Sequence, residues 1–150
     1  NIIPEEAKLT GTIRTYDDKI RQQAQQYTRE AAEHSAQALG AKATVRFQYG
    51  YDVTVNDEGW VQKMLPSLKV ASDGKVAAGH KIGGSEDFSY YAKEAPGIFF
   101  FLGVTPKKNV GKAAPNHSGQ FYVDESSLKV GVRSLSLMTL DTFDLLQEKK

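Results

Sequence analysis

Hydrophobic and polar positions alternate along two stretches of the chain, and this alternation predicts half-buried β-strands. Between positions 7 and 16, Leu9 and Ile13 fall on one face and Arg14 falls on the other. The same alternation returns over residues 44–51. Successive side chains of a strand point to opposite faces, so a period of two is typical of a strand with one face covered.

The segment between these two stretches has a helical period instead. Its apolar positions recur every three, four or seven residues from Asp17 to Leu39, which predicts an amphipathic helix of about 20 residues. Asp17 and Asp18 are suited to cap the start of this helix, and Gly40 to end it. Strand, helix and strand together make one crossover unit.

The second half of the chain predicts further helices around one buried strand. A helix begins after Asp57 and must kink or restart at Pro66, and Ser85 caps a short helix. The apolar run 98–104 predicts a central strand covered on both faces, and a long helix starts near Asp124. The core side of that last helix is expected to comprise Leu128, Val132, Leu135, Phe143 and Leu146.

Composition narrows the possible partners. The 150 residues carry a formal net charge of +1, from 19 basic and 18 acidic side chains. So even a balance leaves no electrostatic footprint for nucleic acid or for an anionic membrane, and we expect neither as a partner. The chain has no cysteine, and no apolar run approaches the roughly 20 residues of a membrane span. The compartment stays open between cytoplasm and periplasm.

His117 is the candidate for metal chemistry. It lies in a polar loop after an apolar run, and a neutral imidazole is the commonest metal ligand. A catalytic zinc needs about three protein ligands, and the other histidines, His34 and His80, show no ligand-like spacing. Either His117 is structural or the other ligands lie outside this chain. The opening Asn1-Ile-Ile-Pro has no initiator Met, so we expect a part of a longer protein.

Two further features suggest binding. Gly83 and Gly84 precede the predicted cap Ser85, and backbone N–H groups at such a helix start make an anion-holding edge. The simpler interpretation is a capped turn, with Glu86 as an ordinary first-turn acid. The simpler interpretation of Arg14, from the residues alone, is a strand residue exposed to solvent. The residues alone therefore indicate part of an α/β enzyme.

Six motifs stand in an order that points to a family. They are Asn1–Pro4, Leu9–Thr15, Gly50–Asp57, Gly84–Phe88, Phe100–Gly103 and Pro115–Ser118. On these motifs the chain resembles the C-terminal part of the metal-dependent amidohydrolases of the hippurate hydrolase, N-acyl-amino-acid amidohydrolase and indole-acetyl-amino-acid hydrolase group. That group lies in the aminoacylase and carboxypeptidase superfamily of clan MH metallopeptidases.

The resemblance implies a fold and a set of site residues. Residues 1–56 would be the second half of a ferredoxin-like lid that makes a homodimer, and 57–150 the C-terminal part of an αβα catalytic domain. His117 matches the last metal ligand. Asn1 and Arg14 match residues that hold the substrate carboxylate, often across the dimer. The loop containing Gly84, Ser85 and Glu86 would line the active site. The general base and the remaining ligands would lie upstream.

The resemblance also implies a reaction, namely hydrolysis of the amide bond of N-acyl amino acids, which are small molecules with a free carboxylate. Two divalent metal ions, zinc or else manganese or cobalt, would activate the water. Two alternatives stay open. The protein would act on small peptides as a carboxypeptidase or dipeptidase, or the chain would be a non-catalytic dimerisation and scaffold module.

Overall fold

The computed structural model describes residues 1–147 and divides the chain into two compact units. The first unit combines Asn1–Thr54 with Lys81–Tyr90, and the second combines Val55–His80 with the chain from Tyr91 onward. The assignment of residues 1–56 to a lid and 57–150 to a catalytic domain stays a prediction.

The first unit is built on helix α1 (Asp18–Ala38). Asp17 caps it as predicted, because its carboxylate accepts a hydrogen bond from the Ile20 amide at 2.9 Å. Gly40 ends it with a positive φ of 71°, a left-handed conformation in which glycine is strongly favoured. The amide of Ala41 reaches back to the Ala36 carbonyl at 2.9 Å. The predicted helix is therefore confirmed at both ends.

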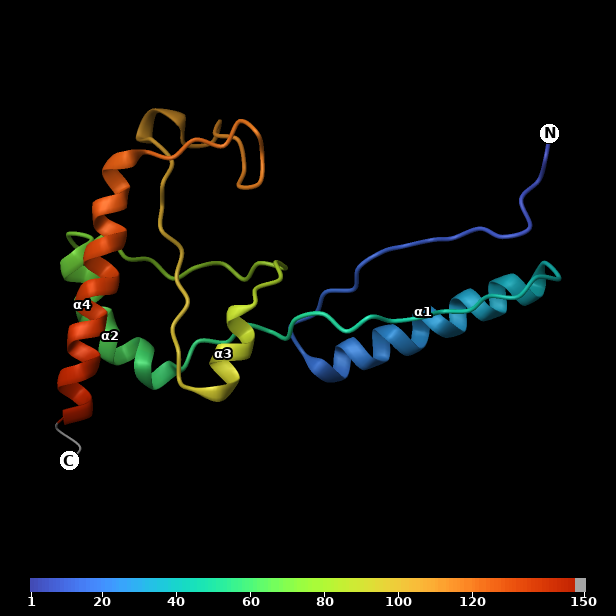
Figure 1. Cartoon of the computed structure of the whole chain (residues 1–150), viewed down its shortest axis with the longest axis horizontal. Coiled ribbons are helices and arrows are strands. Elements are labelled where there is room, and N and C mark those ends of the chain that lie inside the picture. Colours follow the sequence, from blue (N-terminus) through green and yellow to red (C-terminus); the bar gives the residue numbers. More distant parts are fainter. Residues whose placement is uncertain (148–150) are drawn as a thin grey trace. The chain divides into compact units, whose positions relative to one another are not determined.

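The predicted strands do not form in this structure. Residues 7–16, 44–51 and 98–104 run as irregular or extended chain (Figure 1), and no segment within residues 1–147 takes part in a β-ladder. The alternation of apolar and polar positions indicates that one face of each segment is suited to be covered by other parts of a protein. A ladder also needs a neighbouring strand to accept and donate its backbone hydrogen bonds, and alternation within one segment does not specify that neighbour.

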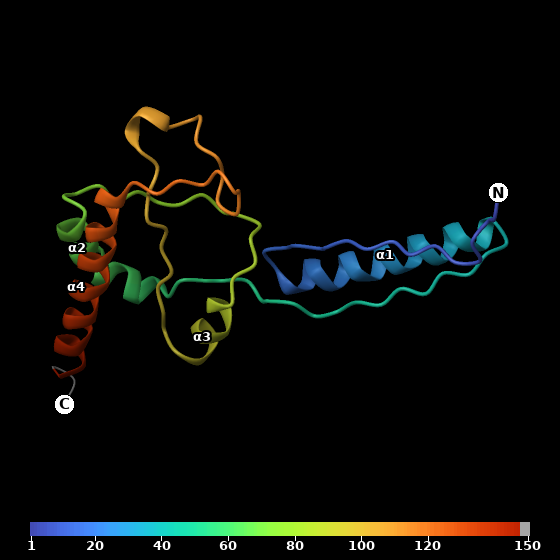
Figure 2. The same cartoon turned by 45° about the horizontal axis from the view of Figure 1, so that its top comes forward.

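The second unit is centred on two helices that lie side by side, α2 (Glu58–Ala71) and α4 (Leu128–Gln147), as Figures 1 and 2 show. Asp57 caps α2 by accepting from the Trp60 amide at 2.8 Å. The helix continues through Pro66, so of the predicted kink or restart the restart does not occur. A short 3₁₀ turn, η2 (Glu125–Ser127), leads into α4.

The core between α2 and α4 is small. The described hydrophobic residues buried in it are Met64 and Ala71, at 1% and 0% exposure. Beside them, the Ser67 hydroxyl bonds to the Asp141 carboxylate, and Ser134 is buried from the α4 side. The helices therefore meet through one large side chain, Met64, and through the small side chains of Ser67, Ala71 and Ser134.

The predicted core side of α4 is wrong, because those apolar side chains are exposed. Their exposed fractions are Leu128 51%, Val132 66%, Leu135 60%, Phe143 58% and Leu146 49%. A helix has a face for each neighbour, and α2 covers the face that contains Ser134. The Lys-rich end at 148–150 lies outside the described residues.

The remaining helical elements of the described residues are the short helix α3 (Phe88–Glu94) and the 3₁₀ turn η1 (Lys107–Asn109). The helix α3 begins at Phe88, so the prediction that Ser85 caps it is wrong. The carbonyls of Glu86 and Asp87 accept the first amides of α3, from Ser89 at 3.2 Å and Tyr90 at 3.0 Å. Ser85 is thus left free for another partner.

Candidate functional site

His117 occupies an exposed turn with an unusual backbone conformation. Its φ is 68°, and Asp73 is the other described non-glycine residue with a positive φ. The Ser118 amide donates to the Pro115 carbonyl at 3.2 Å, and the Asn116 side chain accepts from the His117 amide at 3.0 Å. Left-handed backbone costs a non-glycine residue about 1–3 kcal/mol and clusters at functional sites. His117 shares this conformation with Asp73, so the conformation supports a functional role for His117 only together with the metal-binding chemistry of its imidazole.

The described residues do not make a complete metal site around His117. Within residues 1–147 there is no group of three or more His, Cys, Asp or Glu side chains that could hold a metal ion. His34 and His80 are both exposed. His117 has the chemistry of a ligand, but this chain alone does not supply the remainder of a donor set.

Arg14 is joined to the glycine-rich loop of the first unit. Its Nη1 donates to the Gly83 carbonyl at 2.8 Å and to the Ser85 Oγ at 2.9 Å. The structure therefore brings together Arg14 and Ser85, which lie 71 positions apart in the sequence. Both acceptors are neutral, so neither of them compensates the guanidinium charge.

The remaining predicted site residues of this unit have fewer contacts. Neither Gly83 nor Gly84 has a positive φ, and a Cβ at Gly84 would meet only Ile82 at an ordinary 3.9 Å. Neither position therefore requires glycine for its φ angle or for lack of space. Glu86 is half-buried.

Asn1 is exposed and lies toward the C-terminal end of α1 in both views (Figures 1 and 2). From there the chain runs back to Asp17, where α1 begins. Asn1 and Arg14 thus occupy opposite ends of this segment. Their shared carboxylate role stays a prediction.

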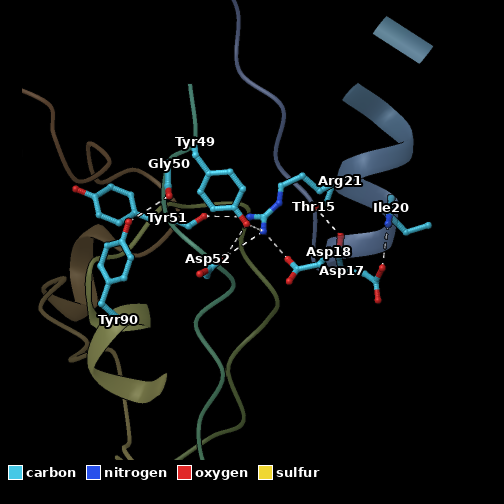
Figure 3. Close-up of polar contacts among 10 residues, drawn as sticks. All are labelled: Thr15, Asp17, Asp18, Ile20, Arg21, Tyr49, Gly50, Tyr51, Asp52 and Tyr90. Atoms are coloured by element: carbon cyan, nitrogen blue, oxygen red, sulfur yellow. Dashed lines mark hydrogen bonds and ion pairs between the residues drawn. The ribbon is translucent and has the colours of Figure 1, made fainter. Parts of the chain in front are cut away.

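Sequence reasoning missed a cluster around Arg21, which Figure 3 shows. Its Nη2 donates to the Asp18 carboxylate at 2.6 Å, to the Asp52 carboxylate at 3.0 Å and to the Tyr49 hydroxyl. Its Nη1 reaches the Tyr51 carbonyl at 3.4 Å. The Arg21 and Asp52 side chains are only 13% and 9% exposed. The spacing of Asp18 and Arg21 was the one local signal, since residues three apart on a helix are neighbours.

This cluster shifts the pKa values of two of its members. The hydrogen bond with Asp52 raises the pKa of Arg21. Partial removal from water raises the pKa of the Tyr49 hydroxyl, while the nearby Arg21 charge opposes that rise. Both groups stay protonated at neutral pH, so the cluster is a fixed structural tie between α1 and residues 49–52.

Two shallow hollows lie in the second unit. One of about 200 Å³ is lined by residues of the loop that contains His117, namely Pro106, Asn109, Lys112, Ala113, Ala114, Gln120 and Tyr122. The other, of about 480 Å³, is lined by residues 55–58 and 92–96, none of which is a predicted site residue. His117 itself is not among the residues that line the smaller hollow.

The chain matches the peptidase family M20/M25/M40 over residues 2–141. It therefore belongs to this family of hydrolases, whose members are α/β proteins and generally depend on metal. The resemblance found in the sequence is thereby confirmed, together with the hydrolase class. The α/β class is that of the family, whereas residues 1–147 of this chain form helices and no strand. No solved structure matches the chain significantly.

Three named relatives illustrate the range of the family. Thermostable carboxypeptidase 2 of Saccharolobus solfataricus is 36% identical over 93% of this chain and 35% of its own length. The N-acetyldiaminopimelate deacetylase of Enterococcus faecalis is 32% identical, over 94% and 36%. The N-acetylcysteine deacetylase of Bacillus subtilis is 28% identical, over 95% and 36%. The chain thus spans about a third of the relatives it matches.

In the part of the chain that the structure describes, no helix is long and apolar enough to cross a membrane.

Proposed function

We propose that the protein hydrolyses the amide bond of N-acyl amino acids with the help of divalent metal. The observation that carries this proposal is the left-handed conformation of His117, in a chain that matches a hydrolase family from residue 2 to 141. His117 would be one metal ligand, and the others would come from residues outside this chain. When bound, two ions of zinc, manganese or cobalt would supply an activated water and polarise the amide carbonyl.

Arg14 would hold the free carboxylate of the substrate. Its guanidinium has no acidic partner among residues 1–147, whereas Arg21 is fully engaged by Asp18 and Asp52. A guanidinium edge matches the two oxygens of a carboxylate and forms charge-assisted bonds with it. The loop 84–86 would line the same region. Asn1, at the other end of the segment, would add an amide donor only from the second subunit of a dimer.

A carboxypeptidase is the second candidate. Two relatives, thermostable carboxypeptidases 1 and 2, each share 36% of their aligned residues with this chain. A peptide substrate also ends in a free carboxylate, so the proposed role of Arg14 is the same for both reactions. What differs is the group on the other side of the amide bond.

A substrate panel separates the two candidates. The full-length protein, loaded with zinc, manganese or cobalt, is assayed on N-acetyl and N-benzoyl amino acids and on dipeptides. Faster turnover of the N-acyl compounds supports the first candidate, and faster turnover of the dipeptides supports the second. If neither class is hydrolysed with any of these metals, the proposed function is wrong.

The role of His117 has its own test. In the full-length protein, His117→Ala should reduce bound metal and lower kcat/KM by more than about 100-fold, which is the upper range for residues that only support a ligand. Exchange of the exposed His80 for Ala is the matched control and should change neither. The 150-residue chain alone should be inactive with every metal. Normal metal content in the His117 variant would return this residue to a structural role.

We also propose a homodimer formed through the first unit, in which Arg14 serves the partner's active site. Full-length Arg14→Ala should lose roughly 30-fold to 1,000-fold in kcat/KM, about 2–4 kcal/mol. Mixed with His117→Ala protein, it should regain part of its activity, because one site of each hybrid dimer is then intact. No recovery despite proven subunit exchange would refute the cross-subunit role.

A further inference from the structure

The contact between Arg14 and the loop 83–85 leaves a defined part of the guanidinium free. Nη1 carries two hydrogens and has two acceptors, the Gly83 carbonyl and the Ser85 Oγ. Nε and Nη2 have no partner among the described residues. These two nitrogens form one edge of the planar group, and their parallel N–H bonds match the two oxygens of a carboxylate.

Ser85 contributes to this arrangement in a way that a helix cap would not. Because α3 begins only at Phe88, the Ser85 hydroxyl is not used to cap a helix amide. It instead accepts from a side chain 71 positions earlier. An arginine side chain has many rotamers, and fixing it before a ligand arrives removes an entropy cost from binding.

We propose that Ser85 is a positioning residue for Arg14. With the Gly83 carbonyl it holds Nη1 and so presents the Nε and Nη2 edge to the carboxylate of the substrate. Ser85 acts through Arg14 and does not itself bind substrate. The inference rests on the proposed function, in which Arg14 holds that carboxylate, and it replaces the expectation that Ser85 lines the site as a direct contact.

The neutral character of the two acceptors is part of the argument. A carboxylate at position 85 would hold Nη1 more strongly, but it would also cancel the charge that attracts the substrate. A hydroxyl and a carbonyl fix the guanidinium and leave that charge available. This explains why a serine suits the position better than an aspartate would.

A double-mutant cycle in the full-length protein tests the proposal. The substrate is the N-acyl amino acid or dipeptide that the wild-type protein hydrolyses fastest, and the variants are Ser85→Ala, Arg14→Ala and the two combined. We expect Ser85→Ala to raise KM about tenfold with kcat changed less than about threefold, the pattern of lost ground-state binding. Added to Arg14→Ala, it should change KM less than about twofold, because nothing remains to be positioned.

Three comparisons sharpen the cycle. Ser85→Thr keeps the hydroxyl and should restore KM to within about threefold of wild type, and Ser35→Ala, an exposed serine on α1, is the matched control. The carboxamide analogue of the same substrate lacks the carboxylate, so its turnover should not respond to Ser85→Ala. A direct substrate contact would instead make the two losses multiply.

The outcomes separate this inference from the proposed function. Multiplicative effects, or an Ser85→Ala protein with normal KM, would overturn the positioning role while the hydrolase stands. A wild-type protein that hydrolyses no compound of the panel would overturn the function, and the positioning role with it.

Discussion

Each of the two units of this chain is stabilised internally by a different kind of interaction. In the first, no residue of α1 is buried, and its ties to the following segment are arginine contacts: Arg21 with Asp52 and Tyr49, and Arg29 with the Val45 carbonyl at 3.0 Å. In the second, α2 and α4 bury Met64 and Ala71 between them. The comparison teaches that charge-assisted bonds hold one unit and exclusion of water holds the other.

This difference has consequences for how each unit responds to its surroundings. Contacts between charges weaken as salt screens them, with a Debye length of about 8 Å at physiological ionic strength. The exposed Asp18 carboxylate is screened more than the pair of Arg21 and Asp52, whose side chains are 13% and 9% exposed. Burial of apolar surface does not weaken with salt in this way. The unit with Arg14 should therefore be the more sensitive to salt and pH, and the unit with His117 the more sensitive to changes in side-chain volume.

The largest effect is expected in the second unit, at Met64. Met64→Ala should destabilise α2 and α4 by about 2–5 kcal/mol, because it leaves a cavity between helices with almost no other core. Chemical denaturation and amide hydrogen exchange over both helices measure this. Gln62→Ala, at an exposed position of the same helix, is the control and should stay within about 0.5 kcal/mol of wild type. Unchanged hydrogen exchange in α4 would contradict the idea that burial of Met64 between α2 and α4 stabilises this unit.

Arg21 is the corresponding position in the first unit. Arg21→Gln keeps length and polarity but removes the charge shared with Asp18 and Asp52, and should destabilise the packing of α1 by about 1–2 kcal/mol. The loss should shrink as salt is raised, while that of Met64→Ala should not. Hydrogen exchange of α1 at low and high salt checks both statements. If the stability losses of Arg21→Gln and Met64→Ala respond equally to salt, the two units are not stabilised by different kinds of interaction.

His117 allows conformation to be separated from chemistry. Glycine tolerates a φ of 68° and alanine does not, so His117→Gly should be more stable than His117→Ala by about 1 kcal/mol. Both variants lack the imidazole, so both should lose metal and activity equally. Denaturation midpoints and metal content of the pair measure the two effects. Equal stability would mean that this turn relaxes freely.

Tyr49 predicts how the first unit responds to alkaline pH. Its folded pKa is raised, so its contribution to stability is fully present below the ordinary tyrosine pKa of about 10 and is lost as pH rises through the folded value. Unfolding measured between about pH 9 and 12 should show this loss, and Tyr49→Phe should remove the part that Tyr49 contributes. A Phe variant with an unchanged pH profile would contradict it.

The smallest effect is expected at Gly131 in α4. A Cβ there would meet the Leu102 Cδ2 at 2.9 Å, but that atom ends a flexible side chain and can move. Alanine also gains about 1 kcal/mol of helix propensity over glycine. Gly131→Ala should therefore be close to neutral. Gly131→Val adds two more methyl groups, and a shift of the Leu102 methyl group alone does not make room for them, so this variant should destabilise the packing of α4 against residues 98–104. Denaturation of both variants tests this.

The sequence was informative where a few neighbouring residues decide the structure. Asp17 and Gly40 predicted the ends of α1 because caps act on amides and carbonyls within one turn. His117 could be selected from its residue type and loop, and six motifs in order identified the family. All of these signals depend on chemistry or on short spacing, which a linear sequence displays directly.

The tertiary structure decided which distant residues meet. Arg14 reaches Ser85 across 71 positions, and Arg21 reaches Asp52 across 31, and no periodicity within a segment specifies such pairs. For the same reason the exposed face of α4 was mistaken for its core face, since the hydrophobic pattern shows that a face is apolar but not which neighbour covers it. Contacts between segments depend on how the whole chain packs, and that is the information that a local pattern lacks.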